Sequence, residues 1–420
     1  MSLSQEKLGT LQNTLEAQHK AYCLKGLNLD LTRGKPSADQ LDLSKELDGI
    51  LNGNYTMDGT DLRNYGGLDG LPSAKTLFAP VIDVTTDEIL IGGNSSLTLM
   101  HQTMTFCHLF GLNGDESAWA SEGDIKFICP VPGYDRHFSV CQHLGIEMIT
   151  VPLLADGPDM DQVEALISAD PLIKGIWCVP RFSNPTGCVY SDETVERLAA
   201  LGNIAGPNFK VFYDNAYAVH ILEPDAPQLA SLMAACRQQG TEDSVFIFGS
   251  TSKITQAGAG VAFMGSSKLN LVALEQHIAM LSIGPDKVNQ ARHVRFLKDQ
   301  ANLSRLMNQH AALLMPRFSA VLCGLEEELG DSGIGDWLSP KGGYFISFNT
   351  LPGLAKAVIA LAAEAGVKLT PAGATYPYGD DPEDRNIRLA PSVPTVDDIT
   401  QATAVFINCV RLATVKKLRD

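Results

Sequence analysis

Residues 244–256 read SVFIFGSTSKITQ, an apolar run that ends in small hydroxyl residues and a single lysine, Lys253. Six similar apolar runs lie elsewhere in the chain, at 88–93, 125–130, 146–152, 174–180, 210–215 and 260–265. They hardly alternate between polar and apolar residues, which is typical of strands buried on both faces of a sheet. Helix-like segments separate several of them. The pattern predicts an α/β fold with a mostly parallel sheet of about seven strands, flanked by helices.

The segment 286–328 is rich in Leu, Arg and Gln, with little Gly or Pro. It predicts a long helix or a helix pair that joins the sheet to a C-terminal α+β lobe holding KGGYFISFN (341–349) and NIRLAPS (386–392). We find no Gly/Ser-rich linker in the sequence, so structured elements are expected to join the lobes.

Composition excludes several classes of protein. The net charge of −16 argues against a nucleic-acid partner. No apolar run approaches the roughly 20 residues of a membrane helix, and the polar N-terminal segment lacks the apolar core of a secretory signal, so we expect a cytoplasmic protein without membrane contact. Nine scattered cysteines, with no C-x-x-C pair, favour reduced thiols over a disulfide framework or a metal site.

Polar residues follow the apolar runs at the edge where open α/β sheets bind ligands. After EILI come two glycines and then Asn94, Ser95 and Ser96 at the start of a helix-like segment, where backbone N–H groups and hydroxyls suit a phosphate. An ordinary helix cap has the same sequence. Tyr134 follows the run at 125–130 and suits stacking on a flat ring, although a core tyrosine is the alternative.

Two further runs end in residues that suit an aromatic cofactor. Asn184, in SNPTG, can donate to a phenolate oxygen, but NPTG is also common turn chemistry. Asp214 ends KVFYD and can hold a proton on a ring nitrogen, with Tyr217 following at helix-turn spacing; a helix N-cap is the alternative.

Lys253 by itself would be read as a surface lysine. Partly desolvated beside a bound cation, its amine can form and break an imine near neutral pH. Each of five different buried runs ends in a group that suits one cofactor: a phosphate turn, a stacking aromatic, a phenolate donor, a carboxylate and this amine. Together they favour the functional interpretation of Lys253.

With these motifs in place, the chain resembles the class I/II aminotransferases of fold type I, which carry pyridoxal 5′-phosphate. LTRGKPS (31–37), NYGGLDGLPSAK (64–75), VPRFSNPTG (179–187) and GSTSKITQAGAG (249–260) resemble most closely the aspartate aminotransferase subgroup called type Ic. The resemblance implies a large cofactor-binding domain at 51–310 and a smaller α+β domain made from residues 1–50 and 311–420.

The resemblance also implies roles for individual residues. Lys253 would hold the cofactor as an imine and move the proton, Asp214 would pair with the pyridine nitrogen, and Asn184 and Tyr217 would bind the ring hydroxyl oxygen. Tyr134 would stack on the ring. At the phosphate, the resemblance implies Ser250, Ser252 and the 94–96 turn, with Tyr65 reaching the phosphate from the partner subunit of a homodimer. At the substrate, it implies Gly34, Asn184 and Arg388, with Arg388 on the α-carboxylate.

One position departs from the family pattern. Most members have a phosphate-binding arginine eight residues after the lysine, where this chain has Val261. The ligand of a distal substrate carboxylate is also open, with Arg33, Arg136 and Arg181 as candidates by charge alone.

The expected activity is ping-pong transamination, with L-aspartate and 2-oxoglutarate as substrates. Alternatives are another reaction with the same cofactor (a lyase or decarboxylase, or aminotransfer from 2-aminoadipate or aromatic donors), and a non-enzymatic regulator with an aminotransferase-like domain. The strongly negative charge and motifs that begin near residue 31 argue against the regulator.

Overall fold

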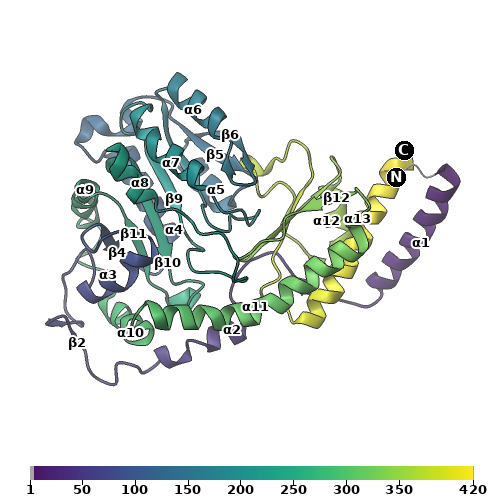
Figure 1. Cartoon of the computed structure of the whole chain (residues 1–420), viewed down its shortest axis with the longest axis horizontal. Coiled ribbons are helices and arrows are strands. Elements are labelled where there is room, and N and C mark those ends of the chain that lie inside the picture. Colours follow the sequence, from purple (N-terminus) through teal and green to yellow (C-terminus); the bar gives the residue numbers. More distant parts are fainter. Residues whose placement is uncertain (1–3, 420) are drawn as a thin grey trace.

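A computed structural model describes residues 4–419. It has a large α/β lobe and a smaller lobe, joined by the long helix α11 (Gln300–Leu329) (Figure 1). The large lobe carries the central sheet, and the smaller lobe combines the first and last segments of the chain.

The central sheet confirms the predicted fold class. All seven predicted runs form strands, and a two-residue strand, β7, adds an eighth. β11 runs antiparallel to both of its neighbours, whereas β10, β9, β8, β5 and β6 pair in parallel. In spatial order the strands are β4 (Ile89–Ile91), β11 (Ala262–Gly265), β10 (Val245–Ser250), β9 (Lys210–Asp214), β8 (Ile173–Cys178), β5 (Lys126–Val131), β6 (Glu147–Leu154) and β7 (Gly157–Pro158).

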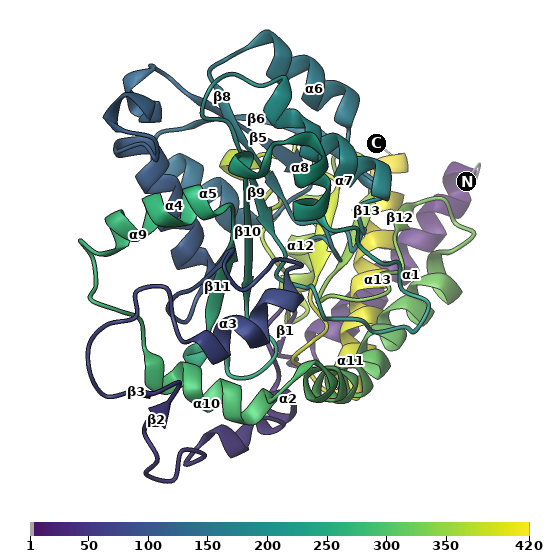
Figure 2. The same ribbon diagram turned by 60° about the vertical axis from the view of Figure 1, so that its left-hand side comes forward.

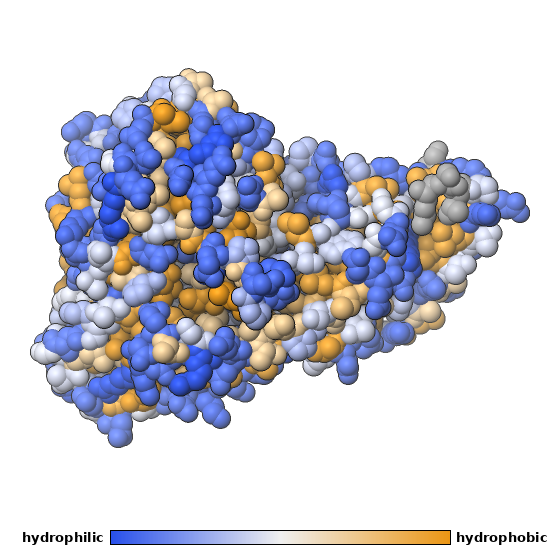
Figure 3. Space-filling model, viewed as in Figure 1, coloured by the Kyte–Doolittle hydropathy of each residue, from blue (hydrophilic) through white to orange (hydrophobic). Residues whose placement is uncertain are grey.

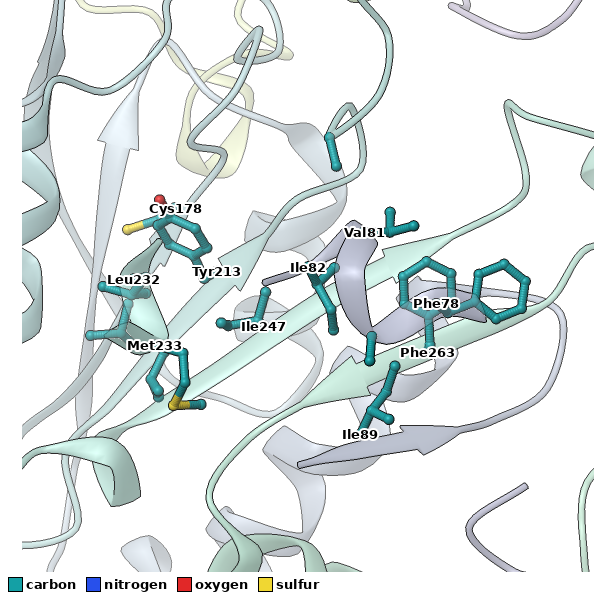
Figure 4. Packing of buried hydrophobic residues seen from close by; sticks show 14 of the residues in the cluster. Phe78, Val81, Ile82, Ile89, Cys178, Tyr213, Leu232, Met233, Ile247 and Phe263 are labelled. Carbon is teal, nitrogen blue, oxygen red and sulfur yellow. The ribbon is translucent and has the colours of Figure 1, made fainter. Parts of the chain in front are cut away.

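Successive residues of the central strands bury opposite faces of the sheet, which explains why the runs do not alternate with polar residues. In β9, Val211 and Tyr213 belong to one hydrophobic cluster and Phe212 to another. Figure 4 shows part of the first cluster, where Phe78 stacks on Phe263 with ring centroids 4.7 Å apart.

Helices cover both faces of this sheet (Figure 2). On one face, the hydrophobic cluster that contains Tyr213 includes buried residues of α3 (Pro72–Phe78), α6 (Met160–Ala169), α7 (Asp192–Ala200) and α8 (Leu232–Gln239). The Phe212 cluster is covered by α4 (Ser96–Leu109), α5 (Asp135–His143) and α9 (Lys268–Ile278). Side chains cap several N-termini; Ser191, for example, accepts a hydrogen bond from the Thr194 backbone N–H at the start of α7.

The predicted helix pair at 286–328 is confirmed as α10 (Lys287–Leu297) and α11. Each begins at an aspartate whose carboxylate accepts a backbone N–H: Asp286 from Asn289, and Asp299 from Asn302. Lys298 and Asp299 separate the two helices. α10 packs beside α3, and α11 continues into the smaller lobe.

The smaller lobe brings the two ends of the chain together: α1 lies along α13 (Figure 1). β1 pairs in parallel with β14, so the N-terminal segment is also held by backbone hydrogen bonds. The elements of this lobe are α1 (Gln5–Cys23), β1 (Leu29–Asp30), α2 (Ala38–Asp42), β12 (Gly335–Trp337), β13 (Ile346–Thr350), α12 (Ala355–Glu364), β14 (Val367–Lys368), β15 (Asn386–Leu389) and α13 (Val396–Arg419). A separate hairpin of β2 (Thr56–Met57) and β3 (Thr60–Asp61) lies outside the sheets of both lobes.

Hydrophilic residues predominate on the face shown in Figure 3. Between residues 4 and 419 no helix has both the length and the apolar character needed to cross a membrane. Seven of the nine cysteines are buried, and Cys23 and Cys323 are not.

We expect Phe263→Ala to lower the free energy of unfolding by about 3–5 kcal/mol, because it removes a fully buried ring that stacks on Phe78 and leaves a cavity between sheet and helix. Leu24→Ala serves as a control, since Leu24 is 80% exposed, and should change it by less than about 0.5 kcal/mol. Chemical denaturation of both variants checks this. Equal effects would contradict the packing that we describe.

Candidate functional site

The carboxyl ends of four neighbouring parallel strands meet at one edge of the sheet, and the predicted residues lie there. Asp214 is the last residue of β9, and Lys253 follows β10 by three residues. Tyr134 lies at the N-terminus of α5, just after β5, and Asn184 lies in the loop after β8. The sheet therefore brings together residues that are up to 119 positions apart in sequence, as 253 minus 134 gives.

Asp214 is a buried carboxylate with one oxygen paired and the other free. Its Oδ2 lies 2.9 Å from Nε2 of His137, which is also buried. The His137 ring stacks on Trp177, with centroids 4.2 Å apart and planes inclined by 7°. No described residue bonds Oδ1, although the atom is buried. A buried carboxylate oxygen without a partner is costly, so this atom is suited to a ligand that carries a proton.

Lys253 is half-buried, with Nζ 5.1 Å from the centroid of the Tyr217 ring. Burial lowers the pKa of the Lys253 ammonium, and the Asp214 carboxylate opposes this by favouring the charged form. The amine therefore loses its proton more readily than that of an exposed lysine.

Two tyrosines border the lysine and the carboxylate. Burial raises the pKa of Tyr217, with smaller contributions from Tyr134 and Asp214. Burial also raises the pKa of Tyr134, followed by the effect of Asp214. Both phenols therefore keep their protons at neutral pH and are hydrogen-bond donors.

Arg388 reaches the site from β15 of the smaller lobe, where it lies opposite Ser347 of β13. It is 6% exposed, and its Nη1 donates to Asp135 Oδ1 at 3.0 Å and to Asn184 Oδ1 at 3.2 Å. Because the Asn184 oxygen accepts from the guanidinium, its amide N–H groups remain available to another acceptor. No described residue accepts from the buried Nε of Arg388.

The two lobes enclose a cavity of about 640 Å³ beside Arg388, lined also by Tyr134, Arg33 and Arg136. Gly34 belongs to this lining, and a Cβ at position 34 would lie 2.5 Å from Cζ of Phe345. Phe345 in turn lies under the Arg388 guanidinium, 4.9 Å from ring centroid to Cζ. A side chain at position 34 would therefore displace the ring that supports Arg388.

The predicted phosphate turn lies at the start of α4, with Ser95 as the N-cap and Ser96 as the first helical residue. The Gly92 and Ala262 backbones tie it to β11: Gly92 N–H donates to Ala262 C=O at 2.8 Å, and Ala262 N–H donates to Gly93 C=O at 2.7 Å. The exposed Asn94 contacts the neighbouring loop through Gly258 C=O at 3.4 Å.

At the end of β10, Ser250 Oγ lies 3.1 Å from Oγ of Ser252, which is in the turn that carries Lys253. Val261, where a phosphate-binding arginine was expected from the family pattern, is 2% exposed. Its N–H donates to Thr251 Oγ1 at 2.9 Å, and its C=O accepts from Thr251 N–H at 2.8 Å. The Val261 backbone thus holds the turn that carries Lys253.

Two predicted residues do not join this group. Tyr65 is 81% exposed and borders a separate cavity of about 620 Å³. The guanidinium of Arg181 donates to the backbone oxygens of Ala218 and Pro227, and Arg181 does not line the cavity beside Arg388. Of the three cations considered for a distal carboxylate, only Arg33 and Arg136 therefore border it.

The sequence analysis did not identify His137, Phe345 or Asp135 as residues of this site. The sequence carries a weak signal for His137, which follows Tyr134 by three residues at the start of a helix and so shares its face. Phe345 has no such signal, because its contact with Gly34 joins segments that are distant in sequence.

Comparison with known proteins agrees with this geometry. The family model described as aspartate amino-transferase matches residues 3–420. An aspartate aminotransferase of Corynebacterium glutamicum is 43% identical over 410 residues, which cover 97% of this chain and 94% of that protein. The crystal structure of an aspartate transaminase from the same organism has a TM-score of 0.95 at 42% identity, covering 99% of this chain and all of that one.

A more distant similarity concerns the fold alone. An α-aminoadipate aminotransferase of Thermus thermophilus, solved in complex with N-(5′-phosphopyridoxyl)-L-leucine, is 22% identical, with a TM-score of 0.74 over 99% of this chain and 100% of that one. From the near full-length match of the family model and the relatives above 40% identity, we conclude that this chain is an aminotransferase and belongs to the aspartate amino-transferase family.

Proposed function

We propose that this enzyme binds pyridoxal 5′-phosphate on Lys253 and transfers the amino group of L-aspartate to 2-oxoglutarate in two half-reactions. The observation that carries the proposal is the buried Asp214, with one oxygen held by His137 and the other without a partner, in the field of the Lys253 amine. A protonated pyridine nitrogen would satisfy this oxygen.

The residues present fit the remainder of the cofactor. Tyr134 lies near enough to Asp214 for that carboxylate to raise its pKa, and its ring would offer a flat face to the cofactor ring. The Asn184 amide N–H groups and the Tyr217 hydroxyl are donors for the ring oxygen. For the phosphate, the donors are Ser250, Ser252 and the start of α4 with Asn94, Ser95 and Ser96; helix N-termini favour anions, so hydroxyls and the helix dipole would replace the arginine missing at Val261.

When bound, pyridoxal phosphate supplies an electrophilic carbonyl carbon and a ring that withdraws electrons from the substrate Cα. Lys253 would hold the cofactor through its carbonyl carbon, and the Lys253 Nζ would be the base that accepts and returns the proton of the substrate Cα. Its lowered pKa favours the neutral amine that this step requires. The Tyr217 ring lies beside this amine, with its centroid 5.1 Å from Nζ.

Arg388 is the proposed ligand of the substrate α-carboxylate. Its Nη1 bond to Asp135 keeps the guanidinium in place in the free enzyme, and a substrate carboxylate would use the unpartnered Nε and offer a two-pronged contact. Arg33 and Arg136 line the same cavity and supply positive charge for the distal carboxylate of aspartate or 2-oxoglutarate. This cluster of cations supports a dicarboxylate substrate.

The proposal includes a cytoplasmic homodimer with shared active sites. Tyr65 and a nearby loop present exposed apolar side chains, including Met280 (82% exposed), Leu281 and Ile283. Lys287 Nζ donates to Gly66 C=O at 2.5 Å and so ties the Tyr65 loop to the start of α10. A second copy that covers this surface would bring Tyr65 to its partner's phosphate. We further propose that residues 51–310 form one domain and residues 1–50 and 311–420 the other.

Mixing the cofactor-loaded enzyme with L-aspartate alone should convert the cofactor stoichiometrically from its aldehyde to its amine form, and 2-oxoglutarate should reverse this while yielding glutamate. Absorbance spectra and product analysis check both steps.

Lys253→Ala should keep the fold, lose the borohydride-reducible link and slow conversion by at least about 100-fold, because it removes the base. The control Lys268→Ala, at an exposed lysine, should behave like wild type. β-Elimination products, carbon dioxide or trapping on another lysine would refute the assignment.

Replacing Arg388 by alanine should weaken amino-acid binding by about 2–5 kcal/mol, because a desolvated charge pair is lost. The matched control is Arg385→Ala, which removes an arginine of the same strand region that pairs with Asp336 and Glu383. Titration of bound-cofactor absorbance with aspartate measures the effect. An unchanged apparent affinity for aspartate in the Arg388 variant would count against its role.

In cofactor-free enzyme, acylation of Lys253 by a small reagent should reach half its maximal rate at a pH below 10.5, the ordinary lysine value, because burial destabilises the ammonium and only the neutral amine reacts. Asp214→Asn should lower this midpoint further, since the carboxylate favours the charged form.

Lys268 is an internal control in the same measurement, because its ion pair with Asp87 raises its pKa. Its midpoint should therefore lie above that of Lys253. Mass spectrometry of the two peptides across pH distinguishes them, and a higher midpoint for Lys253 than for Lys268 would disprove the desolvation that we describe.

A further inference from the structure

The turn that carries Lys253 lies among three buried histidines that the proposed chemistry does not use. His220 follows β9, His293 lies on α10 and His310 lies on α11. They are 3%, 0% and 1% exposed, respectively. Each contacts a different position of the segment 253–255.

Two of these histidines hold consecutive backbone carbonyls. His220 Nε2 lies 3.2 Å from Lys253 C=O, and His310 Nε2 lies 2.9 Å from Ile254 C=O. A carbonyl oxygen only accepts, so Nε2 carries the proton in both rings. Nδ1 of His310 then accepts from the Gln40 amide at 3.0 Å, and Nδ1 of His220 has no partner among residues 4–419.

The third histidine ends a chain of hydrogen bonds. His293 Nδ1 donates to Asn289 C=O at 2.9 Å, so its Nε2 accepts from Thr255 Oγ1, also at 2.9 Å. Thr251 Oγ1, 3.1 Å from Thr255 Oγ1, accepts the Val261 N–H. The chain thus runs from Val261 through two hydroxyls to the imidazole.

Burial lowers the pKa of all three histidines, which favours their neutral forms at neutral pH. Burial lowers the pKa of His220 to about 3, with Lys253 and His310 adding to the effect. Burial also lowers the pKa of His293 and of His310. Neutral imidazoles hold the turn without placing a positive charge next to the Lys253 amine.

We propose that His220, His293 and His310 are positioning residues that hold the 251–255 turn and thereby set where the Lys253 amine lies relative to the substrate Cα. This rests on the proposed function of Lys253. The physical reason is geometric: the lysine side chain is long and flexible, so its reach is defined only if its backbone is fixed, and small displacements of a reacting group cost much of the rate.

The same bonds connect the turn to the smaller lobe. Gln40, on α2, donates to both His310 Nδ1 and the Tyr344 hydroxyl, the latter at 2.9 Å. Its Oε1 accepts from the Ser37 backbone N–H at 3.2 Å. Ser37 Oγ accepts from Arg317 of α11 at 3.2 Å. The N-terminal segment that carries Gly34 is therefore bonded, through Gln40, to the backbone that carries Lys253.

The test compares His220→Leu with His220→Gln, and His310→Leu with His310→Gln, in the full-length, cofactor-loaded enzyme. Glutamine places an amide N–H near the position of Nε2, whereas leucine fills similar space without a donor. Hydrogen–deuterium exchange over residues 251–261 reports on the turn directly. Steady-state kinetics with aspartate and 2-oxoglutarate separate kcat from KM, and thermal unfolding reports on global stability.

In the leucine variants we expect exchange at 251–261 to rise about fivefold or more and kcat to fall about 10- to 100-fold, with KM changed by less than about threefold. The glutamine variants should recover both. The proposal would be overturned if the leucine variants had wild-type exchange and kcat, or if the glutamine variants exchanged as fast and turned over as slowly as the leucine variants. A lower melting temperature with unchanged exchange and kcat would also overturn it.

If a leucine variant does not fold, His220→Asn against His220→Gln gives the same comparison, because asparagine is one methylene shorter and its amide falls short of the Lys253 carbonyl. Borohydride trapping separates this inference from the proposed function. If the cofactor is trapped on Lys253 and the histidine variants have unchanged kinetics, only the proposed histidine roles are wrong. If it is trapped on another lysine in the wild-type enzyme, the proposed function of Lys253 is wrong.

Discussion

The structure of the site depends on one buried carboxylate. Asp214 lies at the end of the central strand β9, between two other buried strands, where an uncompensated charge is costly. His137 compensates one oxygen, and Trp177 holds the His137 ring by stacking. The other oxygen remains for a ligand, and the field of this carboxylate reaches the Lys253 amine. A binding requirement is thus built into the core of the large lobe.

The lysine is held in a different way from the carboxylate. Its Nζ lies over the Tyr217 ring, whereas the turn around it is bonded to Val261, just before β11, and to three imidazoles. The Lys253 side chain is long and flexible, but its backbone is held in place. This arrangement suits an amine that moves protons, because the fixed backbone limits the positions that the amine can reach. Val261, which lacks the expected cation, contributes to this anchor through its main chain.

The smaller lobe forms the side of the site where we propose that the substrate binds. Arg388 arrives on β15 and Gly34 on the N-terminal segment, and the Phe345 ring between them fixes their distance. The ring also explains why position 34 carries no side chain. Contacts from Arg388 to Asp135 and Asn184 cross to the large lobe, so the proposed carboxylate ligand and a proposed cofactor ligand belong to one polar network.

The sequence alone was sufficient for the α/β class, the seven main strands, the helix pair and the residues at the strand ends, because buried parallel strands leave unalternating apolar runs and place their carboxyl ends at one edge. It was not sufficient for His137, Phe345 or the three histidines of the lysine turn, whose roles arise from contacts between distant segments. It also left Arg33, Arg136 and Arg181 equivalent by charge. Only the tertiary structure separated them, because whether a cation faces the cavity depends on how the two lobes pack, and local sequence does not encode that packing.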